Sequence, residues 1–71
     1  MTAPNIKLIY DSRNFTIVKD NLGLLWLASD QKYVAYYDKK IGKFGYNKED
    51  MTDRAKTHFG VFKKMIRNCE I

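Results

Sequence analysis

The chain has 71 residues, of which 45% are hydrophobic and 30% charged, and its formal net charge is +5. This length allows one domain with one small core, and the hydrophobic content is too high for a disordered chain. The single cysteine cannot form an internal disulfide, and the apolar run at 22–28 is far shorter than the roughly 20 residues of a membrane span. We therefore expect a cytoplasmic protein that does not enter a membrane.

Residues 1–5, which hold the only proline, show no periodicity, and we expect a flexible terminus there. Short alternating runs separated by turn residues follow and predict strands. The predicted strands are 6–10, 15–19, 22–28, 32–37 and 43–46. Gly23 indicates a bulge or a close approach in the third strand, and Gly42 suits the positive φ of a hairpin exit. The spacing predicts an antiparallel β-meander of four to five strands over residues 6–46.

The period changes after Asn47, where apolar residues recur at steps of three and four. The residues of this stripe are Met51, Ala55, His58, Phe59, Phe62, Met65, Ile66 and Cys69. They predict one amphipathic helix over about 48–68 with Asn47 as its N-cap. The sequence thus predicts a single α+β domain over 6–71, in which the C-terminal helix packs on one face of the sheet.

Catalytic chemistry is not indicated. The one histidine and the one cysteine are eleven residues apart on the predicted helix, so they cannot form an adjacent nucleophile and base. We interpret His58 as a hydrogen-bonded residue at the core edge and Cys69 as a small buried hydrophobe. The sequence has no metal-binding motif and no glycine-rich phosphate loop. We expect a protein that is no enzyme and that needs no cofactor and no metal.

The predicted strand at 32–37 interleaves tyrosines with lysines. Side chains alternate along a strand, which predicts Tyr33, Ala35 and Tyr37 on the core side. Lys32, Val34 and Tyr36 would then share the other face. With the lysines of the following loop and strand this gives a candidate binding patch. Its members are Lys32, Tyr36, Lys39, Lys40 and Lys43.

A second candidate surface lies on the outer side of the predicted helix, where Lys56, Lys63 and Arg67 flank Gly60 and Lys64 lies beyond them. Glycine inside a helix costs about 0.5–1 kcal/mol relative to alanine. Either the bare backbone lets a phosphate or a neighbouring helix approach, or Gly60 is simply tolerated on a solvated face.

Several short motifs within residues 24–59 resemble a known family. The matching motifs are Trp26, Lys32-Tyr33-Val34-Ala35, Phe44-Gly45-Tyr46 and Arg54-Ala55. In this pattern the chain resembles the sheet-plus-helix DNA-binding domains of the plant Apetala type and the amino-terminal domains of tyrosine integrases. The resemblance implies that the exposed sheet face enters the major groove and that Lys32, Tyr36 and Lys43 contact DNA. The predicted strands contain no arginine, the usual bidentate reader of guanine, so we expect little sequence preference.

The charge of the chain is concentrated in its second half. Residues 36–71 hold nine basic and five acidic residues, against four and three in residues 1–35. This favours a polyanionic partner. We expect a small basic protein that binds nucleic acid, DNA or RNA, through lysines and tyrosines. The alternative is a protein-interaction module or inhibitor, of phage or mobile-element character, that docks on an acidic partner. The lightly charged strand at 6–10 also allows a homodimer formed edge to edge.

Overall fold

A computed structural model describes residues 6–71, and the predicted flexible terminus at 1–5 lies outside the described residues. Five antiparallel strands form one sheet in the order β1-β2-β3-β4-β5. The strands are β1 (Lys7–Asp11), β2 (Phe15–Lys19), β3 (Leu25–Ser29), β4 (Lys32–Asp38) and β5 (Lys43–Tyr46). The predicted antiparallel meander is confirmed, with five strands.

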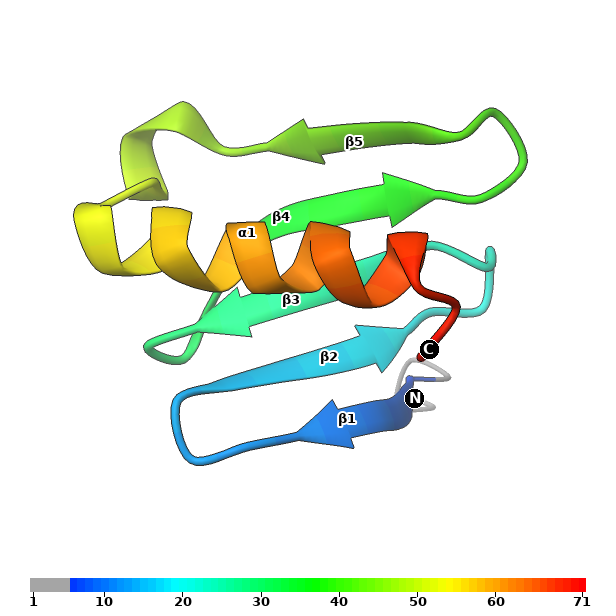
Figure 1. The fold of residues 1–71 in the computed structure, drawn as a ribbon, viewed down its shortest axis with the longest axis horizontal. Helices are drawn as coiled ribbons and strands as arrows, with labels where there is room; N and C mark the ends of the chain where they lie inside the picture. The colour runs from blue at the N-terminus through cyan, green and yellow to red at the C-terminus, as the bar shows by residue number, and fades with distance from the viewer. Residues whose placement is uncertain (1–5) are drawn as a thin grey trace, which may run out of the picture.

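One α-helix, α1 (Asp53–Arg67), lies across one face of this sheet (Figure 1). Alternate residues of the strands and every third or fourth residue of the helix meet there, which is the arrangement that the two periodicities predict. The core cluster is Ile17, Leu25, Leu27, Val34, Ala35, Ala55, Phe62 and Met65. The α+β architecture with the helix on one face is confirmed. No helix in the described part of the chain has the length and apolar character to cross a membrane.

The other face of the sheet, which we call the open face, lies away from α1, and no helix or strand of residues 6–71 covers it (Figure 1). Leu25 and Leu27 of β3 point into the core, so Trp26 and Ala28 between them point to the open face. Val18 of β2 pairs with Trp26 and therefore lies on the same face. The open face thus has a mainly apolar centre.

An irregularity in the β3–β4 ladder changes which residues of β4 face the core. The register shifts before Ala28, which pairs with Tyr33, so Val34 is an extra residue that forms a β-bulge. Val34 is only 2% exposed and belongs to the core, whereas Tyr33 lies on the open face and is 48% exposed. The prediction that Tyr33 packs in the core while Val34 faces away is therefore wrong. Ala35 and Tyr37 do face the core, as predicted.

Tight turns join the strands at both ends of the sheet. Asp30 and Gln31 connect β3 to β4 with φ of 53° and 68°. Positive φ at both central residues is typical of the type I′ turn, whose twist matches that of the flanking strands. The predicted positive φ of Gly42, before β5, is confirmed at 65°.

The third strand begins later than predicted. The carboxylate of Asp20 accepts hydrogen bonds from the backbone N–H groups of Leu22 and Leu24, each at 2.9 Å. These bonds hold the chain in a turn, in which Gly23 has a φ of 88°. Gly23 therefore belongs to the turn and forms no bulge, and β3 starts at Leu25.

The helix also begins later than the predicted residue 48. Asn47 caps a short 3-10 helix, η1 (Lys48–Asp50), by accepting a hydrogen bond from the Glu49 N–H at 3.2 Å. Thr52 then has extended backbone geometry, and its hydroxyl accepts a hydrogen bond from the Ala55 N–H at 3.2 Å. Threonine is a favourable N-cap, so α1 starts at Asp53.

The last turn of the helix places Cys69 in water. The Cys69 N–H bonds to the Ile66 carbonyl and the Glu70 N–H to the Met65 carbonyl, the two bonds of a Schellman motif. Cys69 therefore occupies the left-handed position of the motif, with a φ of 57°. Its side chain is exposed. The prediction that Cys69 is a buried member of the helical stripe is wrong because the helix ends at Arg67.

Candidate functional site

Three aromatic side chains gather at the centre of the open face. The ring of Trp26 on β3 contacts the rings of Tyr33 and Tyr36 on β4, with centroid distances of 5.8 Å and 5.1 Å. We call these three residues the aromatic cluster. Tyr33 is exposed, and Trp26 and Tyr36 are half-buried. Aromatic side chains that are partly exposed together on an uncovered sheet face are typical of binding surfaces.

Gly45 makes it possible for one of these rings to lie against the sheet. Tyr36 pairs with Gly45 across β4 and β5. An alanine Cβ at Gly45 would overlap the Cε1, Cζ and hydroxyl atoms of Tyr36. The outer end of the phenol ring therefore occupies the space above the glycine backbone.

Trp26 is held in place by Asp20. The indole Nε1–H donates a hydrogen bond to Asp20 Oδ2 at 2.9 Å. This bond, together with those from the backbone N–H groups of the turn, lowers the pKa of Asp20 below its ordinary value of 3.8. The turn before β3 and the aromatic cluster therefore form one hydrogen-bonded unit at neutral pH, where Asp20 is ionised.

Aliphatic residues extend the apolar surface toward β1. Ile6 and Leu8 are 45% and 57% exposed. Leu8 pairs with Val18, which itself lies beside Trp26. The open face therefore runs from aliphatic residues at the β1 edge to the aromatic cluster. β1 is one of the two edge strands, and a register shift next to Ile9 interrupts its ladder with β2.

The structure separates the lysines of the predicted patch. Lys32 pairs with Ser29, whose side chain is buried on the core side, so Lys32 lies on the side of the helix and does not share a face with Tyr36. That part of the prediction is wrong because the bulge shifts the alternation. Lys43 lies two residues before Gly45 on β5 and shares the open face with Tyr36. Lys39 and Lys40 are exposed in the loop between β4 and β5.

The predicted binding surface on the helix is exposed, but it lies on the other side of the molecule from the open face. Lys56, Gly60 and Arg67 are on the side of α1 that is opposite its buried residues. Lys63 is half-buried because its Nζ atom lies 4.7 Å from the centroid of the Phe59 ring. These four residues and the open face are on opposite sides of the molecule. A role of the helical residues in binding stays a prediction.

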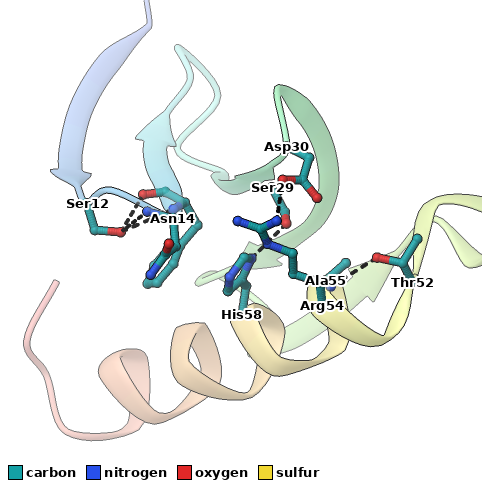
Figure 2. Close-up of polar contacts among 9 residues, drawn as sticks. Ser12, Asn14, Ser29, Asp30, Thr52, Arg54, Ala55 and His58 are labelled. Carbon is teal, nitrogen blue, oxygen red and sulfur yellow. Dashed lines mark hydrogen bonds and ion pairs between the residues drawn. The ribbon is translucent and has the colours of Figure 1, made fainter.

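His58 has a structural hydrogen bond. Its Nδ1 atom lies 2.7 Å from the Ser29 hydroxyl oxygen, and the two residues are 7% and 2% exposed (Figure 2). The His58 ring also packs against Phe15 at 5.1 Å. Burial closes the serine hydroxyl to a substrate, and the pair joins α1 to the end of β3. In residues 6–71 no three His, Cys, Asp or Glu side chains lie together as a metal site would require.

Two members of the aromatic cluster were outside the predicted binding patch. Trp26 alternates with Leu25 and Leu27 along its strand, which predicts that Trp26 lies on the other face of the sheet from these two leucines. No such signal exists for Tyr33, because a bulge depends on how two strands pair and leaves no local pattern.

No protein-family model, curated protein sequence or solved structure matched the chain. The resemblance to Apetala-type and integrase domains therefore stays a prediction.

Proposed function

We propose that this protein binds single-stranded nucleic acid on the open face of its sheet and has no catalytic role. Bases stack on the rings of the aromatic cluster, Trp26, Tyr33 and Tyr36, and lysines near the β4–β5 loop contact phosphates. The observation that carries the proposal is the aromatic cluster, in which the outer end of the Tyr36 ring lies over Gly45 and the ring contacts Trp26. Every base has a flat π face, so an outward ring binds bases without reading their edges.

The charge distribution supports this type of binding. Lys43 lies on the open face opposite Asp38, and the exposed Lys39 and Lys40 follow β4, so three lysines and one aspartate leave net positive charge beside the aromatic cluster. The whole chain has a net charge of +5 and a pI near 9.4, which attracts phosphates at long range.

The lack of arginine on the strands favours single strands over the major groove. Arg13 lies in a loop and Arg54 on the helix, so the open face offers no bidentate reader of guanine. Stacking requires bases that are free of a partner strand, because in a duplex their faces are already stacked. We therefore expect tighter binding to single strands than to duplex and little sequence preference.

The test compares two exposed tyrosines on opposite sides of the sheet. Tyr33 is 48% exposed on the open face, and Tyr46 is 57% exposed on the helix side, where its ring lies 5.9 Å from Phe59. Binding of an oligo(dT) strand is measured by the fluorescence of Trp26 at two salt concentrations. Tyr33→Ala should lower the affinity about 5-fold or more, because one stacked base contributes about 1–3 kcal/mol. Tyr46→Ala should leave it unchanged.

Two outcomes would refute the proposal. The first is that the wild-type protein does not bind oligo(dT) at low salt. The second is that the two tyrosine variants lose equal affinity. Binding of a protein partner that depends on Leu8 and hardly on salt would instead support an interaction module, for which the exposed aliphatic edge at Ile6 and Leu8 is suited.

A further inference from the structure

A shallow pocket of about 300 Å³ lies at one end of the sheet. There the β1–β2 loop, the β3–β4 turn and the start of α1 come together (Figure 1). We call it the end pocket. Its lining residues are Ser12, Arg13, Asn14, Phe15, Thr16, Ala28, Asp30, Gln31 and Arg54. Two of the three arginines of the chain thus meet at one place, although they are far apart in the sequence.

The loop that carries Arg13 is ordered by its neighbour. The Ser12 hydroxyl accepts hydrogen bonds from the N–H groups of Asn14 and Phe15 at 3.3 Å and 3.1 Å, and it donates one to the Phe15 carbonyl at 2.9 Å. These bonds fold the loop back on itself. Arg13 is therefore presented from a defined turn.

Arg54 reaches the pocket from the first turn of α1. Figure 2 shows Arg54 extending toward Asp30, with His58 and the Ser12 loop nearby. The guanidinium Nη1 atom lies 3.7 Å from Asp30 Oδ1, and the two side chains are 61% and 54% exposed. An exposed pair at this distance is weak, and a guanidinium has five N–H donors. Arg54 can therefore bind a further anion.

The side chains that line the pocket have a net positive charge, and the Asp11 carboxylate adjoins them through its hydrogen bond from the Thr16 hydroxyl at 3.3 Å. Arg13 and Arg54 are the basic lining residues and Asp30 the acidic one, and the remaining lining residues are neutral. A phosphodiester has one negative charge and oxygen acceptors that suit the planar guanidinium fork. The side-chain amides of Asn14 and Gln31 are further donors, whereas the Ser12 and Thr16 hydroxyls already donate to the Phe15 carbonyl and to Asp11 Oδ1.

The pocket adjoins the aromatic cluster. Ala28, which lines the pocket, pairs with Tyr33 of the cluster. Thr16, another lining residue, pairs with Ala28 and shares the open face. The lysines of the β4–β5 loop lie at the opposite end of β4. A strand that crosses the open face would therefore meet positive charge at both ends and aromatic rings between them.

We infer that the end pocket binds a backbone phosphate of the strand that stacks on the aromatic cluster, with Arg13 and Arg54 as its ligands. This inference rests on the proposed function and deepens it. It defines the path of the strand along β3 and β4, and it assigns two arginines that contact phosphate and read no base.

The test uses Arg13→Gln and Arg54→Gln, with Lys64→Gln as the control that removes the same charge from the outer side of α1. Affinity for an oligo(dT) of about twelve nucleotides, within the known site sizes of roughly 4–16, is measured against salt concentration. Each arginine variant should lower the affinity about tenfold. Each should also reduce the slope of log K against log salt by about 0.7, the value for one phosphate contact on a single strand.

A third variant is expected to strengthen binding at the end pocket. Asp30→Asn removes the charge that competes with the phosphate for Arg54 and should raise the affinity. Asparagine tolerates the positive φ of 53° at this position, so the turn is retained.

The outcomes separate this inference from the proposed function. If Lys64→Gln loses as much affinity and slope as the arginine variants, the pocket is no phosphate site and the inference is overturned. The same holds if the arginine variants bind like wild type while Tyr33→Ala still weakens binding, and in that case the stacking function stands. If the wild-type protein does not bind oligo(dT) at all, both fail.

Discussion

Gly45→Ala is the substitution that most directly tests the aromatic cluster. The added methyl group would overlap the outer end of the Tyr36 ring, so the ring has to rotate away from the sheet. The backbone itself accepts alanine, because Gly45 is not among the residues with positive φ. The substitution therefore moves one binding side chain without removing it.

The effect on stability should be small because two contributions oppose each other. Replacing glycine by alanine at a compatible position stabilises by about 0.4–1 kcal/mol through the unfolded chain. Tyr36 loses its ring contact with Trp26, now at 5.1 Å, which is worth about 0.5–1.5 kcal/mol. The free energy of unfolding should thus change by no more than about 1 kcal/mol, or roughly 4–8 °C in Tm.

The effect on binding should be much larger. Loss of one stacked base costs about 1–3 kcal/mol, which corresponds to a fall in affinity of roughly 5- to 150-fold. Trp26 is the only tryptophan, so its emission reports both the displacement of Tyr36 and the binding of oligo(dT). Circular dichroism gives the thermal unfolding of the same samples.

The control is Tyr36→Leu, which removes the ring and keeps Gly45. It should weaken binding to a similar extent. If the emission of Trp26 changes in Gly45→Ala while oligo(dT) binds as tightly as before, the position of the Tyr36 ring over Gly45 plays no part in binding and the reasoning is refuted.

Three further substitutions test other parts of the structure by thermal unfolding. Cys69→Gly should stabilise by about 1 kcal/mol, because glycine adopts the φ of 57° without a Cβ penalty, and an unchanged Tm would contradict the Schellman geometry. Gly60→Ala should stabilise by about 0.5–1 kcal/mol, since a Cβ there meets no atom within 4 Å, and a lower Tm would contradict this. Asp20 has a lowered pKa, so its ionised form stabilises the fold above the ordinary pKa of 3.8, and this contribution disappears as the pH falls through the lower pKa of the folded state. The Tm difference between wild type and Asp20→Asn should therefore be present at pH 7 and vanish in acid. A pH-independent difference would show that the ionised Asp20 carboxylate does not stabilise the fold.

Much of the fold was predictable because its signals are local. Ile17 and Leu27 alternate with outward residues in their strands, and Ala55, His58 and Phe62 repeat at helical spacing, so the core follows from two periodicities. The helix start was not predictable from spacing alone. Asn47 and Thr52 are both good caps, and the chain uses both, one for a 3-10 helix and one for α1.

The end pocket could not be predicted because it depends on which turns share an end of the sheet. Arg13 and Arg54 lie 41 positions apart in the sequence. Only the antiparallel order of the strands and the direction of α1 bring the β1–β2 loop and the first turn of α1 together (Figure 1). Tertiary arrangement of this kind leaves no trace in composition or periodicity.

The β-bulge explains how the cluster itself is built. Tyr33 and Tyr36 are three residues apart, and an odd separation in a regular strand puts side chains on opposite faces. The extra residue, Val34, restores them to one face beside Trp26. In a regular register Tyr33 would instead point toward the helix, where Val34 and the small Ala55 now line the same pocket. A phenol ring does not fit the space of a valine in a close-packed core. The same one-residue irregularity therefore fills the core and assembles the open face.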